Sequence, residues 1–94
     1  MKTIMLPPVI DRTVTAELTP ELTEALGTGA GVLITADNVR QIGQCGLQLL
    51  LSAALTASRR DMAFIVQDAS EAFMNAVRIS GLRRHLFGHA IQTL

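Results

Sequence analysis

The sequence predicts an α/β fold: a small mixed, largely parallel sheet with helices packed against it. Two continuous apolar runs, Val32–Ala36 and Met62–Val66, lack the alternation of a half-exposed strand and are typical of strands covered on both faces. Between them lies Gly46–Ser58, which is rich in helix formers and has no internal breaker. Strands that alternate with helices are joined by crossover connections, so they pair mainly in parallel.

The segment before the first of these runs predicts one strand and one helix. Ile4–Leu6 stops at Pro7-Pro8, and because proline cannot donate to a sheet we expect an edge strand or the end of a strand here. Residues 9–15 follow as a turn or a second short strand. Thr19-Pro20 predicts a helix start, with a hydroxyl N-cap and proline at the first helical position. The apolar face of this helix comprises Leu18, Leu22, Ala25 and Leu26.

Glycines then separate this helix from the next strand. Gly27-Thr28-Gly29-Ala30-Gly31 leads from a helix into a strand. A phosphate-binding loop runs the other way, from strand to helix, so we interpret these glycines as a turn.

The C-terminal third predicts another helix and a last short strand. Asp68 or Ser70 caps a helix that runs to about Ser80, and Gly81 fits its C-terminal cap. The buried stripe of this helix comprises Ala72, Phe73, Ala76 and Val77. We expect Leu82, Leu86 and Phe87 to fold back as a short turn, and residues 90–94 to form a short strand or tail.

Composition narrows the classes of function. The 94 residues suit one domain, residues 1–94, and their formal net charge is zero, which disfavours a nucleic-acid partner. Charged residues make up 17% of the chain, below the typical value of about 25%, which indicates apolar surface that faces a partner. No acid-base or nucleophile constellation stands out, so we expect no enzymatic activity and no cofactor.

Cysteine and histidine usage disfavours metal sites and disulfides. Cys45 is the single cysteine, which excludes an intramolecular disulfide and a cysteine-based zinc site. His85 and His89 have a metal-ligand spacing but no acidic third ligand nearby, so we expect no metal. The N-terminal apolar run is too short for a signal peptide or a membrane span, which favours a cytoplasmic chain without membrane insertion.

The helix that begins near Cys45 has two apolar faces. One comprises Leu47, Leu50, Leu51, Ala54 and Leu55. The other comprises Leu49, Ala53 and Thr56. This pattern is either a wide core face or a core face plus a face available to a partner. Cys45 itself is either a small packed residue or a reactive thiol at a helix N-terminus, as in a redox-sensing module.

The segment Val32–Leu51, VLITADNVRQIGQCGLQLLL, resembles the STAS domain, which is shared by sulfate-transporter C-terminal domains and bacterial anti-sigma factor antagonists. The likeness extends through the Phe64-Ile65-Val66 strand and the following helix, and covers roughly residues 17–87. The family pattern is an apolar strand, an Asp, a few residues, and then Asp-Ser-Ser-Gly-Leu at a helix start. Here Gly43-Gln44-Cys45-Gly46 replaces Asp-Ser-Ser-Gly, so Cys45 occupies the position equivalent to the phosphoacceptor serine.

The resemblance implies a small mixed sheet with helices, and a non-enzymatic adaptor in bacterial signal transduction. The implied partner is an anti-sigma-type kinase or a chemotaxis component. The usual serine phospho-switch should be absent, because a serine kinase needs a hydroxyl acceptor. One alternative is a STAS subunit of a lipid-trafficking membrane ABC transport complex, and another is the redox-sensing module. We define the predicted partner surface as Gln41, Gln44, Cys45, Gly46, Gln48, Leu49 and Ser52.

Overall fold

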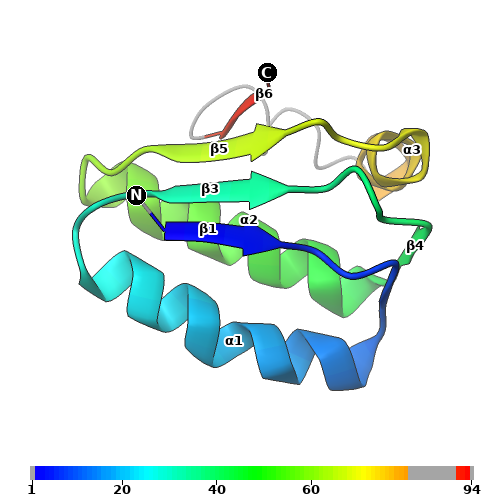
Figure 1. Ribbon diagram of the computed structural model, residues 1–94, viewed down its shortest axis with the longest axis horizontal. Coiled ribbons are helices and arrows are strands. Elements are labelled where there is room, and N and C mark those ends of the chain that lie inside the picture. The colour runs from blue at the N-terminus through cyan, green and yellow to red at the C-terminus, as the bar shows by residue number, and fades with distance from the viewer. Residues whose placement is uncertain (1, 81–90, 94) are drawn as a thin grey trace.

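A four-stranded parallel sheet organises the chain in a computed structural model that describes residues 2–80 and 91–93. The strand order is β1-β3-β5-β6 (Figure 1), with bounds Lys2–Met5, Val32–Thr35, Phe64–Gln67 and Ile91–Thr93. Lys2 is paired with Val32, Val32 with Phe64, and Phe64 with Ile91, all in parallel. The predicted α/β fold and largely parallel sheet are therefore confirmed, as is the edge position of the first strand.

Three helices in the described part of the chain accompany this sheet. The helices α1 (Arg12–Gly27) and α2 (Gln44–Arg59) pack side by side against it, and α3 (Glu71–Ser80) lies next to β4 (Figure 1). The buried core is entirely apolar over the described residues. Val32, Ile34, Phe64 and Val66 are its central strand positions and are at most 1% exposed.

The first helix begins seven residues earlier than Thr19, so the predicted start at Thr19-Pro20 is wrong. Asp11 is the N-cap, and its carboxylate accepts a 2.9 Å hydrogen bond from the Val14 N–H. Pro20 lies inside α1 rather than at its first position. The predicted apolar face is nevertheless buried as a whole: Leu18, Leu22, Ala25 and Leu26. The turn that follows α1 uses Gly29 and Gly31 at φ of 75° and 92°, values that favour glycine.

The central strands differ from prediction in their outer face. In β3, Val32 and Ile34 are buried, whereas Leu33 and Thr35 are half-buried. The strand β5 repeats this alternation, with Phe64 and Val66 buried. The face toward α1 and α2 is therefore fully buried, and the predicted cover of the second face is only partial.

A second, two-stranded parallel sheet carries the start of α2. Its strands are β2 (Val9–Ile10) and β4 (Gln41–Ile42), paired Val9 to Gln41 and Ile10 to Ile42. The carbonyl of Pro8 accepts hydrogen bonds from the N–H groups of Arg40 (2.7 Å) and Gln41 (3.1 Å). This pairing fixes the loop that enters α2.

The third helix begins where the sequence predicts it. Ser70, not Asp68, is the cap: its hydroxyl accepts a hydrogen bond from the Phe73 N–H at 3.1 Å and donates one to the Val39 carbonyl at 2.7 Å. In the predicted buried stripe, Phe73 and Val77 are buried and the two alanines are half-buried. The predictions for Gly81, for the turn of Leu82, Leu86 and Phe87, and for His85 and His89 fall outside the described residues. The last short strand is confirmed as β6.

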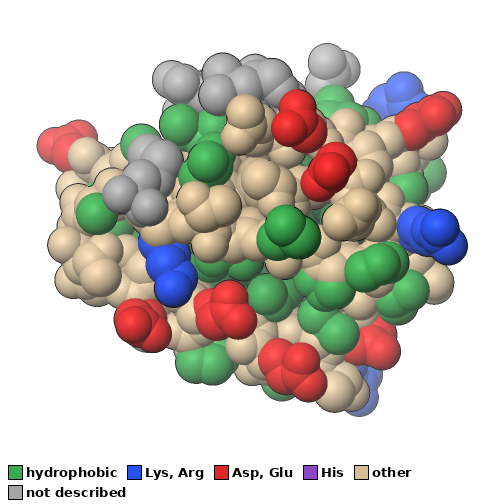
Figure 2. All heavy atoms as spheres, viewed as in Figure 1, with side chains coloured by type: hydrophobic (Ala, Val, Ile, Leu, Met, Phe, Trp, Pro, Cys, Tyr) green, Lys and Arg blue, Asp and Glu red, His purple; other side chains and the backbone are tan. Residues whose placement is uncertain are grey.

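The last features of the fold are the hydropathy of its helices and the distribution of charge on its surface. Among the described residues, no helix has both the length and the hydropathy needed to cross a membrane. On the face shown in Figure 2, Lys and Arg side chains lie apart from one another, with hydrophobic side chains among them.

Candidate functional site

The start of α2 is held by backbone contacts rather than by a side-chain cap. Gly43 is the N-cap and makes no side-chain capping bond. Its N–H donates to the Ile10 carbonyl at 3.0 Å, and its carbonyl accepts the first helical bond from the Leu47 N–H at 3.2 Å. The N–H groups of Gln44, Cys45 and Gly46 precede that bond and point out of the helix end, where they favour acceptors.

Gly46 lets this helix end pack closely on the small sheet. A Cβ placed on it would lie 2.9 Å from Cγ2 of Ile10 and 3.0 Å from Cγ1 of Ile42. Gly46 is buried, so within the predicted partner surface it is a packing position and presents no side chain to a partner.

Most of the other predicted surface residues are exposed. Gln41 lies on β4, and Gln44, Cys45, Gln48 and Ser52 lie on the solvent side of α2. Cys45, Gln48 and Ser52 are three, four and seven residues apart, so they form one continuous stripe. Cys45 is a free, exposed cysteine. The structure thus brings these polar residues together on one side of one helix.

This exposed stripe carries no charge. No charged residue lies between Arg40 and Arg59, a span that includes β4 and nearly all of α2. A solvent-facing helix surface ordinarily carries charged residues. The absence of charge on an exposed helix face is the signal for this site, and the run of uncharged residues that produces it is visible in the sequence alone.

Of the two interpretations of α2, Ala53 supports the wide core face and not a second face available to a partner. Ala53 is 4% exposed and belongs to the core, because α1 packs against this side of α2. Leu49 is half-buried and packs against the same core. Conversely, Leu51 and Leu55, predicted to be core residues, are only half-buried. The buried face is therefore wide and rotated toward α1.

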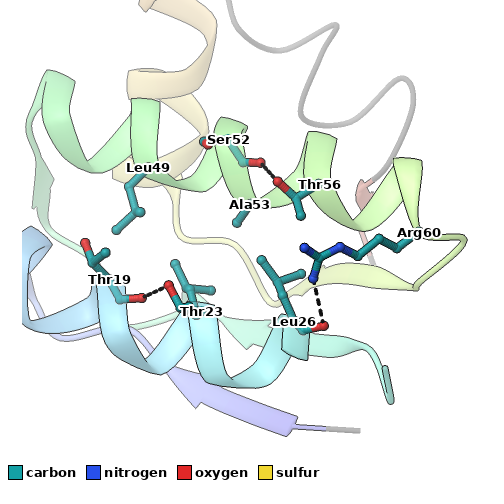
Figure 3. Close-up of a pocket in the computed structure, with 9 residues that line it drawn as sticks. Thr19, Thr23, Leu26, Leu49, Ser52, Ala53, Thr56 and Arg60 are labelled. Carbon is teal, nitrogen blue, oxygen red and sulfur yellow. Dashed lines mark hydrogen bonds between the residues drawn. The ribbon is translucent and has the colours of Figure 1, made fainter. Parts of the chain in front are cut away.

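A groove runs between α1 and α2 (Figure 3). It has a volume of about 260 Å³. Its α1 wall comprises Thr19, Leu22, Thr23 and Leu26. Its α2 wall comprises Leu49, Ser52, Ala53 and Thr56, with Arg60 at the end. Leu49 and Ser52 thus belong both to the groove and to the predicted partner surface.

Arg60 links the C-terminal ends of the two helices. Its guanidinium donates to the Leu26 carbonyl at 3.4 Å, so it supplies a cation near the end of α1, whose own last turn has no basic residue. In the sequence this arginine directly follows Arg59, the last residue of α2. The contact with α1 depends on the way the helices pack and has no local sequence signal.

The described residues contain no group of three or more His, Cys, Asp or Glu side chains placed to hold a metal ion. No family model matches the chain, and no curated protein matches it.

Proposed function

We propose that this chain is a non-enzymatic, STAS-like adaptor that binds a protein partner through the start and the exposed stripe of α2. The partner would be a bacterial signalling protein, an anti-sigma-type kinase or a chemotaxis component. The observation that carries the proposal is the uncharged exposed stripe of Cys45, Gln48 and Ser52, with the uncharged and exposed Gln44 beside it at the helix start.

The chemistry of that stripe suits an interface. Protein interfaces are depleted of charged residues at their centre, because a charge that loses water without gaining a partner is costly. Glutamine, serine and cysteine side chains lose water at a smaller cost and can donate or accept hydrogen bonds. The open N–H groups at the helix start add donors to the same area.

The resemblance to the STAS domain supports the same location. The residues that carry it, Val32–Leu51, contain β3, β4 and the first half of α2. In that family the regulated serine precedes the Gly-Leu pair, and here this position is Cys45. A serine kinase needs a hydroxyl group as its acceptor, and Cys45 offers a thiol. Binding at this surface would therefore not be switched by phosphorylation of residue 45.

The test is partner binding with a charge placed on the stripe. The partner is first co-purified from cells that naturally contain the chain, identified by mass spectrometry, and then titrated by calorimetry. Gln48→Glu is nearly isosteric and should weaken binding at least about tenfold, because it buries an unpaired carboxylate. Thr13→Glu adds the same charge at an exposed position of α1 and should leave the affinity within about twofold.

Equal affinities for the two variants would contradict the location of the site. A membrane ATPase as the co-purified partner would instead favour the alternative of a transport complex.

A further inference from the structure

The groove between α1 and α2 has an apolar floor. Leu22, Leu26 and Ala53 are 2%, 8% and 4% exposed, and Leu49 forms part of one wall (Figure 3). From Thr19 to Leu26 the groove follows α1 for about 10 Å, taking 1.5 Å of rise per residue. A volume of about 260 Å³ over this length suits a short, slender molecule rather than a nucleotide or a folded peptide.

The hydroxyl groups of the three threonines along the groove already donate hydrogen bonds within their own helices. Thr19 donates to the Thr15 carbonyl at 2.9 Å, and Thr23 donates to the Thr19 carbonyl at 2.8 Å. On the other wall, Thr56 donates to the Ser52 carbonyl at 2.9 Å. These walls therefore offer few donors to a ligand, and an alkyl chain fits them better than a polar body does.

Arg60 is the charged hydrogen-bond donor among the residues that line the groove. One of its nitrogens reaches the Leu26 carbonyl at 3.4 Å, the far limit of a hydrogen bond, and within the described part of the chain it pairs with no carboxylate. The acidic residues of α1, Glu17, Glu21 and Glu24, lie on the opposite side of that helix from Thr19 and Thr23. The guanidinium thus keeps donors available for the planar fork that binds a carboxylate.

We propose that this groove binds a small amphiphile, an apolar chain that ends in one carboxylate, with the carboxylate on Arg60 and the chain over Leu22, Ala53 and Leu49. The C-terminal ends of α1 and α2 both lie near Arg60 and carry partial negative charge, so they do not attract an anion. The Arg60 guanidinium is therefore the one group among the described residues of the groove that would hold the carboxylate. This inference is independent of the proposed function, although the two sites share Leu49 and Ser52.

The experiment is a titration of the ¹⁵N-labelled chain with octanoate, followed by amide chemical shifts. Octanol and octylammonium, which have the same chain, are the matched probes. Octanoate should shift the resonances of Thr19, Thr23, Ser52 and Thr56 in a saturable way, and the two other probes should bind at least about tenfold more weakly.

Two arginine variants separate this site from general charge effects. Arg60→Gln should weaken octanoate binding about tenfold or more. Arg59→Gln changes the same charge on the neighbouring exposed residue, outside the groove, and should change affinity less than twofold. Arg60→Lys keeps the charge and should bind octanoate more tightly than Arg60→Gln.

The proposal is overturned by the absence of saturable shifts at the groove residues, or by equal binding of octanol and octanoate. Equal effects of Arg60→Gln and Arg59→Gln would also overturn it. The dispersion of each variant's own spectrum shows whether it is folded. If Arg60→Gln is unfolded, Arg60→Met, which also removes the charge, takes its place, and equal affinities of Arg60→Met and Arg59→Gln for octanoate would overturn the proposal.

Discussion

Pro20 offers a sharp test of the architecture, because the structure and the local sequence signal predict opposite effects for its replacement. Pro20 is the ninth of the 16 residues of α1, so it removes the hydrogen bond to the Ala16 carbonyl and crowds that carbonyl. A proline inside a helix costs about 3 kcal/mol relative to alanine. Proline also lowers the conformational entropy of the unfolded chain, which offsets about 0.4–1 kcal/mol of that cost. Pro20→Ala should therefore stabilise the protein by about 2 kcal/mol.

The assay is urea unfolding followed by circular dichroism, with thermal unfolding as a second measurement. For a domain of this size, about 2 kcal/mol corresponds to a rise in Tm of roughly 8–16 °C. Pro8→Ala is the matched control: Pro8 is exposed in the loop between β1 and β2, so its replacement should cost about 0.4–1 kcal/mol. An unchanged or lower stability of Pro20→Ala would refute the reasoning, since that result is expected if Pro20 stood at the first position of the helix.

The remaining predictions concern packing, capping and the thiol. Gly46→Ala should destabilise by about 1 kcal/mol, because overpacking against Ile10 and Ile42 costs about 1–3 kcal/mol and the gain in helix propensity returns about 1. Gly27→Ala, where a Cβ meets nothing within 4 Å, should be neutral or stabilising; chemical denaturation of both variants checks the pair, and equal effects would contradict the close packing. Ser70→Ala should lower the free energy of unfolding by about 1–2 kcal/mol, because it removes the cap of α3 and the hydrogen bond to the Val39 carbonyl. The control Ser58→Ala, at an exposed position, should lower it by under about 0.5 kcal/mol. Equal losses in the two variants would argue against the cap. Cys45 should react with a thiol reagent in the native state as fast as it does in urea, and strong native protection would show that it is buried.

Much of the fold could be predicted because the sequence patterns are local and strong. The apolar runs at β3 and β5 have no charged residue, and α2 has no breaker after Gly46, so the α/β order follows directly. The start of α1 could not be placed correctly because Thr13, Val14 and Thr15 favour strands and because proline suggests a helix beginning. The apolar spacing from Val14 to Leu18 and Leu22 is the contrary signal that the sequence does carry.

Features that depend on packing between helices and strands could not be predicted from the sequence. The rotation of α2 that buries Ala53 depends on where α1 lies, and sequence spacing alone does not determine it. The contact between Arg60 and the Leu26 carbonyl joins residues 34 positions apart. The exposure of Cys45, Gln48 and Ser52 could be predicted because the helix and its start could be, whereas the burial of Gly46 depends on its neighbours Ile10 and Ile42.

The central claim, that a partner covers the start of α2, is tested most directly by the alkylation rate of Cys45. This single thiol is exposed in the free chain and lies within the first turn of the helix. With saturating purified partner, the rate should fall at least about tenfold, because an interface centre excludes solvent and reagent. An unchanged rate in a complex whose integrity is verified by size-exclusion chromatography would contradict the claim.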